Sequence, residues 1–328
     1  MGTEKFVIFL CILLSLILCS TYKTNIVQTY RLVSAKQMSL AHLPNEWDWR
    51  NISKKDAELW TQMFKIPIAP GSYTSRVFNQ HMSRWCGCCY FIAVIQSIQD
   101  KLNLAFGIKR PTMIMKPLLE LDAQLAMDAY NMHRRQTHPE WNVCHGGHPE
   151  QVITAIKQGH IPLVYVDSDG FGWFGHARTL SSMPISQVKL TDDSIVHENV
   201  NEKIQMTILS RGTMVLGVNA NCITEADANG FVNSEVFGSK NHAVSVVGWR
   251  VYNGKKYWIA RNSWGNARAP VKKPDDTSCV SLDKNTCHTE TSEWKGDKNK
   301  PGYVYIPFDY GPIKGTPSPW FFCCPNVF

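Results

Sequence analysis

The chain has little that would place it with nucleic-acid-binding or metal-dependent proteins. Its net charge is +7 and its pI about 8.8, but no run of five or six basic residues occurs. Scattered charges are typical of a solvated surface, so we expect no nucleic acid partner. Internal repeats, low-complexity tracts and the paired ligand spacing of a zinc site are also missing. We therefore expect neither a metal nor a cofactor.

Long hydrophobic runs are missing after the N-terminus, so no segment there is predicted to cross a bilayer. The apolar run from Phe6 to Leu18 follows Lys5 and is too short for a membrane span. Its position predicts a signal peptide over residues 1–21, and the alternative is a buried hydrophobic helix. We expect a protein of the secretory pathway, either secreted or in a lysosome- or vacuole-like compartment, without stable membrane insertion after signal removal. Disulfides are permissible in such a protein.

The composition is that of a globular protein with a sizeable core. The chain has 328 residues, of which 44% are hydrophobic and 19% charged, enough for one large or two medium domains. Helical patterns dominate the first half of the chain, and short apolar runs bounded by turns dominate the second. This distribution predicts an α+β protein with two lobes. Helices are expected at 89–106, 118–130 and 150–158, and strands at 214–218, 243–249, 256–261 and 302–306.

Cys89 is the first candidate for a reactive group. Apolar residues follow it at helical spacing, which predicts a helix that begins at Cys89 and ends near Gly107. A sulfur at a helix N-terminus lies beside unpaired backbone N–H groups and the positive end of the helix dipole, and both favour the thiolate. Because a nucleophilic cysteine also needs a base, we expect a histidine from elsewhere in the chain. The alternative for a single cysteine is an inert core residue.

Two later segments supply the missing groups. They are Asn241-His242-Ala243-Val244 and the run from Trp258 to Gly265, which contains Asn262. Together with Cys86-Gly87-Cys88-Cys89-Tyr90, they resemble the papain-like cysteine peptidases, in which a cysteine motif is followed far downstream by histidine and asparagine. The resemblance implies that Cys89 is the nucleophile, His242 its base and Asn262 the group that orients the imidazole. It also implies that the side-chain amide of Gln80 helps to hold the oxyanion.

The same resemblance implies a fold and further site residues. The fold is a papain-like two-lobed domain over residues 43–328, with a helical lobe at about 43–160, a β-barrel-like lobe at about 161–328 and the active-site cleft between them. A short propeptide is expected at 22–42 and a charged insert at 266–301. Gly146 and Gly147 would pair with the backbone of a substrate, which the missing Cβ atoms allow. Trp264 would border the substrate, and Cys144 would form a disulfide with Cys86.

The loop before Cys89 is longer than usual for this family. The distance from Gln80 to Cys89 is nine positions (89 − 80), three more than in most papain-like enzymes. The insertion resembles a loop of the family's carboxypeptidases, in which a histidine binds the terminal carboxylate of the substrate. The resemblance assigns that role to His81, with Arg84 as an assisting cation. The alternative is a neutral surface insertion.

These residues predict a cysteine peptidase that acts on peptides or proteins with a free C-terminus, as a monocarboxypeptidase. Within the same fold, endopeptidase or dipeptidase action is the first alternative, if the altered loop leaves the cleft open. The competing class is a catalytically silent binding protein, since Cys88 replaces the serine that the family places beside the nucleophile. The presence of nucleophile, base and orienting amide together favours the enzyme.

Overall fold

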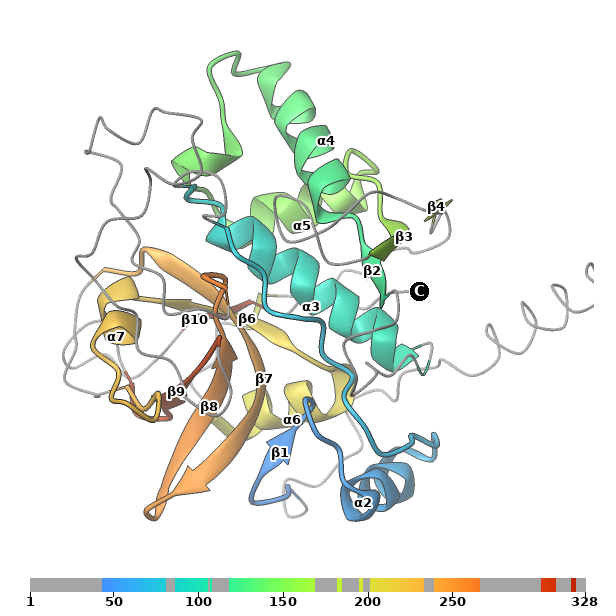
Figure 1. Cartoon of the computed structure of the whole chain (residues 1–328), viewed down its shortest axis with the longest axis vertical. Helices are drawn as coiled ribbons and strands as arrows, with labels where there is room; N and C mark the ends of the chain where they lie inside the picture. The colour runs from blue at the N-terminus through green and yellow to red at the C-terminus, as the bar shows by residue number, and fades with distance from the viewer. Residues whose placement is uncertain are drawn as a thin grey trace, which may run out of the picture.

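The computed structural model describes most of the chain from residue 43 onward (Figure 1). The described residues are 43–80, 86–105, 107, 118–168, 182–184, 195–196, 201–232, 239–265, 302–310 and 320–322. The expected signal peptide at 1–21, the propeptide at 22–42, the insert at 266–301, His81 and Arg84 lie outside them. Among the helices so described, none combines the length and the apolar character that a membrane span requires.

The helix α3 (Cys89–Ala105) runs through the middle of the molecule, between the main sheet and the helices α4 and α5 (Figure 1). All its residues except the last are buried, including the polar Gln96, Asp100 and Lys101. The turn after it contains Gly107 with φ 63°, in agreement with the predicted helix end. The other helical elements are α2 (Lys54–Phe64), α4 (Ala123–Arg135), η3 (Val143–His145), α5 (Pro149–Lys157), α6 (Asn201–Arg211) and α7 (Ala220–Thr224).

The main sheet is antiparallel and has the strand order β5-β10-β6-β7-β8-β9, with β1 paired to β7. In the part of the chain that the structure describes, its outer strands do not pair with each other, so the expected β-barrel-like lobe is an open sheet. A smaller sheet has the order β2-β3-β4. The strands are β1 (Trp47–Asp48), β2 (Leu118–Leu121), β3 (Val164–Ser168), β4 (Ser182–Pro184), β5 (Ile195–Val196), β6 (Met214–Val218), β7 (His242–Tyr252), β8 (Lys255–Arg261), β9 (Tyr303–Pro307) and β10 (Trp320–Phe322).

The register of the central strands brings two segments of interest to one end of the sheet. Ser245 of β7 lies opposite Arg261 of β8. His242 is the first residue of β7 and Asn262 follows the last residue of β8. Because antiparallel neighbours run in opposite directions, the start of β7 and the end of β8 lie side by side.

One predicted helix is only partly correct. The segment 118–130 was expected to be helical throughout, but Leu118–Leu121 forms β2 and pairs with β3. The helix α4 begins after Asp122, whose side chain accepts a hydrogen bond from the backbone N–H of Leu125. A side chain of this kind satisfies a free N–H at a helix start and thereby marks the boundary.

The first described residues pack against the main sheet, although the sequence placed them in the helical lobe. The indole N–H of Trp49 donates to the carbonyl of Ile208, and that of Trp60 to the carbonyl of Leu209, both in α6. Both rings are buried in the same cluster as residues of β6 to β9. The lobes therefore do not divide at one sequence position, because β1 and α2 belong with the strands of the second half.

Candidate active site

Cys89 is the first residue of α3, as predicted, and only 8% of its surface is exposed. The backbone N–H of Ala243 points at its sulfur, as do the N–H groups of Tyr90 and of Cys89 itself, and each lowers the pKa of the thiol. Since Ala243 follows His242 in β7, the sulfur at the helix start lies against the strand that carries the expected base. The two segments that the sequence singled out therefore meet in the structure.

Burial and the surrounding N–H groups act on the Cys89 thiol in opposite directions. The N–H groups lower its pKa, as expected for a sulfur at a helix start, whereas burial raises it to about 11. Removing a thiolate from water costs more than these dipoles contribute in the free protein. Cys88 is completely buried, and burial raises the pKa of its thiol as well. Both neighbouring cysteines are thiols at neutral pH.

His242 and Asn262 form a short hydrogen bond, with 2.7 Å between Nε2 and Oδ1. Oδ1 also accepts the backbone N–H of Ser263 at 2.8 Å. Because a backbone N–H can only donate, this second bond fixes the orientation of the amide, and Nε2 must carry the proton that it shares with Oδ1. In the neutral ring, Nδ1 is then left as the acceptor, which is the state a base requires.

The surroundings of His242 keep the ring neutral. Burial lowers the pKa of His242 to about 4, while the hydrogen bond that Nε2 donates to Asn262 acts in the opposite direction. The ring of Trp264 covers the imidazole, with 4.8 Å between ring centroids and 33° between planes. Transfer of the thiol proton from Cys89 to a neutral imidazole would create a reactive thiolate.

Gln80 connects the segment that contains Asn262 with the loop that leads to Cys89. Its backbone N–H donates to the carbonyl of Ser263 at 2.8 Å, and its side-chain oxygen accepts the Ser263 hydroxyl. Its Nε2 donates to the carbonyl of Cys86 at 2.7 Å. A side-chain amide has two N–H donors, so the second remains available for an oxyanion near Cys89.

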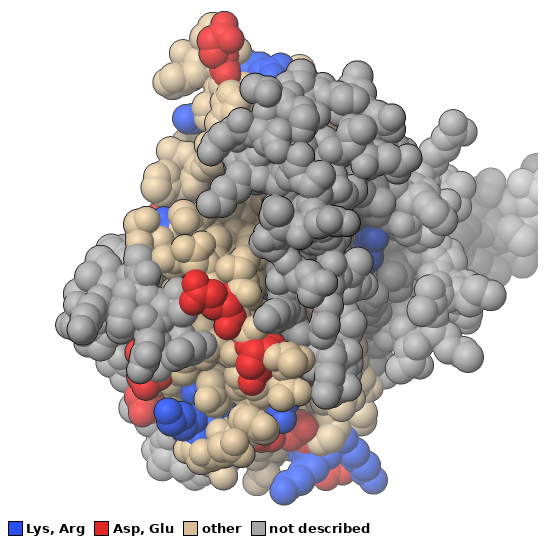
Figure 2. All heavy atoms as spheres, turned by 60° about the vertical axis from the view of Figure 1, so that its left-hand side comes forward, with Lys and Arg blue, Asp and Glu red and all other residues tan. Residues whose placement is uncertain are grey.

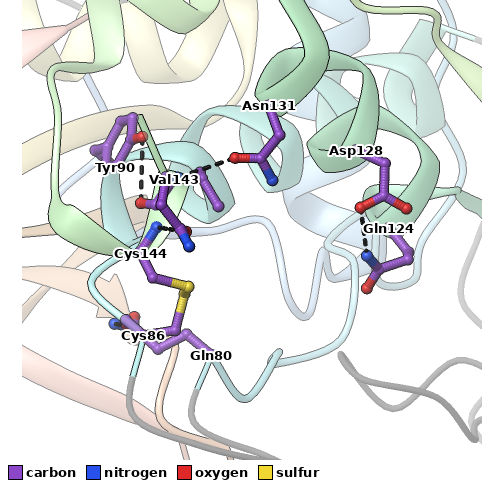
Figure 3. Close-up of a disulfide and its surroundings, with 9 residues drawn as sticks. Gln80, Cys86, Tyr90, Gln124, Asp128, Asn131, Val143 and Cys144 are labelled. Atoms are coloured by element: carbon purple, nitrogen blue, oxygen red, sulfur yellow. Dashed lines mark hydrogen bonds between the residues drawn. A yellow bond between two sulfur atoms is a disulfide. The ribbon is translucent and has the colours of Figure 1, made fainter. Parts of the chain in front are cut away.

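The disulfide between Cys86 and Cys144 is present, with an S–S distance of 2.08 Å (Figure 3). Beside it, the N–H of Gly87 donates to the carbonyl of Cys144 at 2.8 Å. The disulfide closes a loop of 58 residues and fastens the chain before Cys89 to the segment that contains the glycine pair. Asn131 of α4 supports that segment, since its side-chain oxygen accepts the N–H of Val143 (Figure 3).

The two glycines of this segment are needed for different reasons. Gly146 has φ 94° and ψ 171°, a conformation that other residues avoid, and a Cβ there would meet no atom within 4 Å. At Gly147 a Cβ would come within 2.6 Å of the Tyr90 ring. Gly146 therefore leaves its backbone beside open space, while Gly147 allows the close approach of Tyr90, the residue after Cys89.

Sequence reasoning missed Ser263, which fixes the amide of Asn262 and binds Gln80. The only sequence signal for Ser263 is that it directly follows Asn262. Among the described residues, no three His, Cys, Asp or Glu side chains are grouped so that they could hold a metal ion. On the face shown in Figure 2, the visible Lys and Arg side chains form no continuous basic surface, and uncharged residues cover a broad area.

Comparison with known proteins agrees with this geometry. Residues 70–269 match the family model described as papain family cysteine protease. The chain is 28% identical over 255 residues to cathepsin Z of Onchocerca volvulus, covering 73% of this chain and 72% of that protein. It is 26% identical over 228 residues to cathepsin F of Mus musculus, covering 68% of this chain and 40% of that protein.

Solved structures support the fold. The proform of the ragweed cysteine protease Amb a 11 superposes with a TM-score of 0.51 at 17% identity, covering 89% of this chain and 69% of that one. Bromelain from Ananas comosus, in complex with the inhibitor E64, gives 0.50 at 20% identity, covering 85% and 98%. At these identities the likeness concerns the fold alone, and it confirms the α+β papain-like architecture. Because the family model matches residues 70–269, more than half of the chain, the chain belongs to the papain family of cysteine proteases.

Proposed function

We propose that this protein is a monocarboxypeptidase, a cysteine peptidase that removes single residues from the C-terminus of peptides. The observation that carries the peptidase chemistry is the hydrogen bond between His242 and Asn262. The next residue, Ala243, directs its N–H at the sulfur of Cys89. Because Nε2 of His242 is bound to Asn262, Nδ1 is the ring nitrogen that can take the thiol proton.

In the proposed reaction, the Cys89 sulfur attacks the scissile carbonyl carbon while its proton passes to Nδ1 of His242. The carbonyl oxygen becomes an oxyanion, held by the N–H of Cys89 and the second N–H of the Gln80 amide. The C–N bond then breaks, and the imidazolium protonates the leaving amine. Water, deprotonated by His242, attacks the resulting thioester and releases the acid product and the Cys89 thiol.

The glycine pair supplies the site for the substrate backbone. A Cβ at Gly146 would meet no protein atom within 4 Å, so the space beside this backbone is open. An extended peptide can therefore approach it. The disulfide from Cys144 to Cys86 holds this segment to the chain just before the nucleophile. We propose that Trp264 borders the same substrate on the side of His242.

The exopeptidase specificity rests on the inserted loop. The residues at its two ends are joined by the hydrogen bond from Gln80 Nε2 to the carbonyl of Cys86. The two residues that flank positions 81–85 are therefore held together, and Cys86 lies three positions before Cys89. We propose that His81 there binds the terminal carboxylate of the substrate and that Arg84 adds positive charge. The similarity to cathepsin Z supports this assignment.

In the test, the matured protein is given three forms of one peptide: one with a free C-terminus, one with a C-terminal amide and one blocked at both ends. We expect release of the last residue from the peptide with a free C-terminus, and little or none from its C-terminal amide. His81→Ala should remove this preference, while Lys157→Ala, an exposed charge on α5, should leave it unchanged. Equal cleavage of acid and amide would contradict the role of His81. Efficient cleavage inside a peptide blocked at both ends would instead indicate an endopeptidase.

A second experiment separates the enzyme from a silent binding protein. An epoxide that mimics a peptide should modify Cys89, and His242→Ala should abolish the modification. Cys88 should stay unlabelled, since it is completely buried and its thiol is harder to ionise. Absence of any adduct at Cys89, with and without reductant, would support the binding protein.

We also propose that residues 1–21 direct the chain into the secretory pathway and that residues 22–42 are removed on maturation. N-terminal sequencing of protein secreted by cultured cells tests both boundaries. A mature N-terminus near residue 43 is expected, and an intact Met1 on protein recovered from the medium would contradict both proposals.

A further inference from the structure

A buried ion pair joins the helix of Cys89 to the strand that leads to Asn262. Arg261 is the last residue of β8 and Asp100 lies in α3, and their side chains are 0% and 2% exposed. The distance between Nη2 and Oδ2 is 2.7 Å. Two charges in the interior are costly unless they are paired and fully hydrogen-bonded.

Further hydrogen bonds hold the pair in place. Nη1 of Arg261 donates to Asp100 Oδ1 at 3.2 Å, to the carbonyl of Ser75 at 2.9 Å and to the Ser75 hydroxyl at 3.0 Å. The N–H of Ser75 donates to Asp100 Oδ1 at 2.6 Å. The planar guanidinium therefore engages the carboxylate with two nitrogens, a geometry that fixes direction as well as distance.

The ion pair is connected to the proposed catalytic groups through both segments. Asp100 is eleven residues from Cys89 (100 − 89) on one rigid helix, about three turns away. Arg261 is directly followed by Asn262, whose backbone N–H donates to the carbonyl of Gly302 at 2.9 Å. One further contact joins the same layers, from the Ser245 hydroxyl of β7 to the carbonyl of Ala93 in α3 at 3.2 Å.

We propose that Arg261 and Asp100 are positioning residues that hold Asn262, and through it His242, in register with Cys89. The inference rests on the proposed catalytic roles of those three residues. The glycine pair is anchored separately, through the disulfide of Cys144 and the ring of Tyr90. Loss of the ion pair should therefore lower kcat and leave KM nearly unchanged.

The test uses two variants that keep the size of the side chains. Arg261→Lys retains the charge but loses the two-nitrogen contact, and Asp100→Asn retains most of the hydrogen bonds but loses the charge. Both should lower kcat at least about tenfold, because a displacement of about 1 Å at a reacting centre can cost about 100-fold. KM should stay within about twofold. A kcat within twofold of the wild-type value in both folded variants would overturn the proposal.

A double variant and a control separate positioning from stability. Arg261→Met with Asp100→Leu removes both charges and can recover the thermal midpoint, because apolar replacement of a buried pair is often neutral. Its kcat should stay low even so. Lys54→Met removes another ion pair, between the exposed Lys54 and Glu58, which both belong to α2. An equal loss of kcat in Lys54→Met and the double variant would contradict the proposal.

Alkylation of Cys89 without any substrate makes the result independent of the proposed peptidase activity. The rate of reaction with iodoacetamide against pH reports how well His242 takes the thiol proton. A decrease of at least about threefold at pH 7 is expected in folded Arg261→Lys, and an unchanged profile would count against positioning. If the wild type alkylates rapidly through His242 but cleaves no peptide, the proposed function fails while the positioning role is still measured.

Discussion

The ring of Tyr90 lies against the backbone of Gly147, so that a Cβ added to the glycine would come within 2.6 Å of the ring. Tyr90 follows Cys89 in α3, and its hydroxyl lies 3.4 Å from the carbonyl of Val143. The residue after the proposed nucleophile therefore sets the position of the segment proposed to bind the substrate backbone. A larger residue at position 147 must move either the ring or that segment.

Gly147→Ala should therefore destabilise the protein and impair substrate binding. Overpacking of this kind costs about 1–3 kcal/mol. We expect a rise in KM, measured with a C-terminal peptide substrate, and a lower thermal midpoint. Gly254→Ala is the control, because Gly254 has a positive φ of 75° but open space around its Cα, in the β7–β8 turn. It should cost about 1–2 kcal/mol through backbone strain and leave KM unchanged.

Asn262→Ala should weaken the base and shift its titration. The hydrogen bond that His242 donates to Asn262 raises the pKa of His242, so its loss lowers that pKa further below about 4. A hydrogen bond to a charged group contributes about 1.5–3 kcal/mol, which corresponds to a loss of about 10- to 150-fold in kcat/KM. The acid limb of the alkylation rate of Cys89 should move to lower pH. A limb that moves to higher pH would show that the amide does not stabilise the imidazolium.

His242 should make the protein less stable in acid. Burial lowers the pKa of His242 from an ordinary value of 6.5 to about 4. The unfolded chain therefore binds more protons than the folded one between these values, and stability is lost as the pH falls from about 6.5 to about 4. His242→Gln should remove this loss, which is on the order of 3 kcal/mol when complete. Urea unfolding at pH 7.5 and pH 4 measures this loss of stability. If the free energy of unfolding falls equally in wild type and variant between the two pH values, His242 is not its cause.

Replacing both Cys86 and Cys144 by serine should lower stability and activity together. Opening a loop of 58 residues costs about 4 kcal/mol on the chain-entropy model. Because Gln80 Nε2 binds the carbonyl of Cys86, the oxyanion donor should lose its support as well. Urea unfolding and kcat of the double variant, compared with Cys222→Ser, test both effects. Cys222 is a buried free cysteine outside the disulfide, and its replacement should leave kcat unchanged. An unchanged kcat in the double variant would show that the disulfide does not support catalysis.

Local patterns in the sequence were sufficient for the elements that carry the proposed chemistry. The apolar spacing after Cys89 predicts α3, and the runs around His242 and Asn262 predict the start of β7 and the end of β8. The segment 118–130 shows the limit of this reasoning. Four apolar or long side chains before Asp122 fit a strand as well as a helix, and pairing with β3 decides between them.

The sequence by itself determined which residues this protein brings to the proposed site, because the proposed nucleophile, base and orienting amide each lie in a short recognisable segment. Only the tertiary structure decided their electrical state, since the pKa values of Cys89 and His242 depend on burial by chain segments far from them in sequence. It also decided that Arg261 meets Asp100, 161 positions away, because such a contact follows from the packing of β8 on α3 and has no local signature.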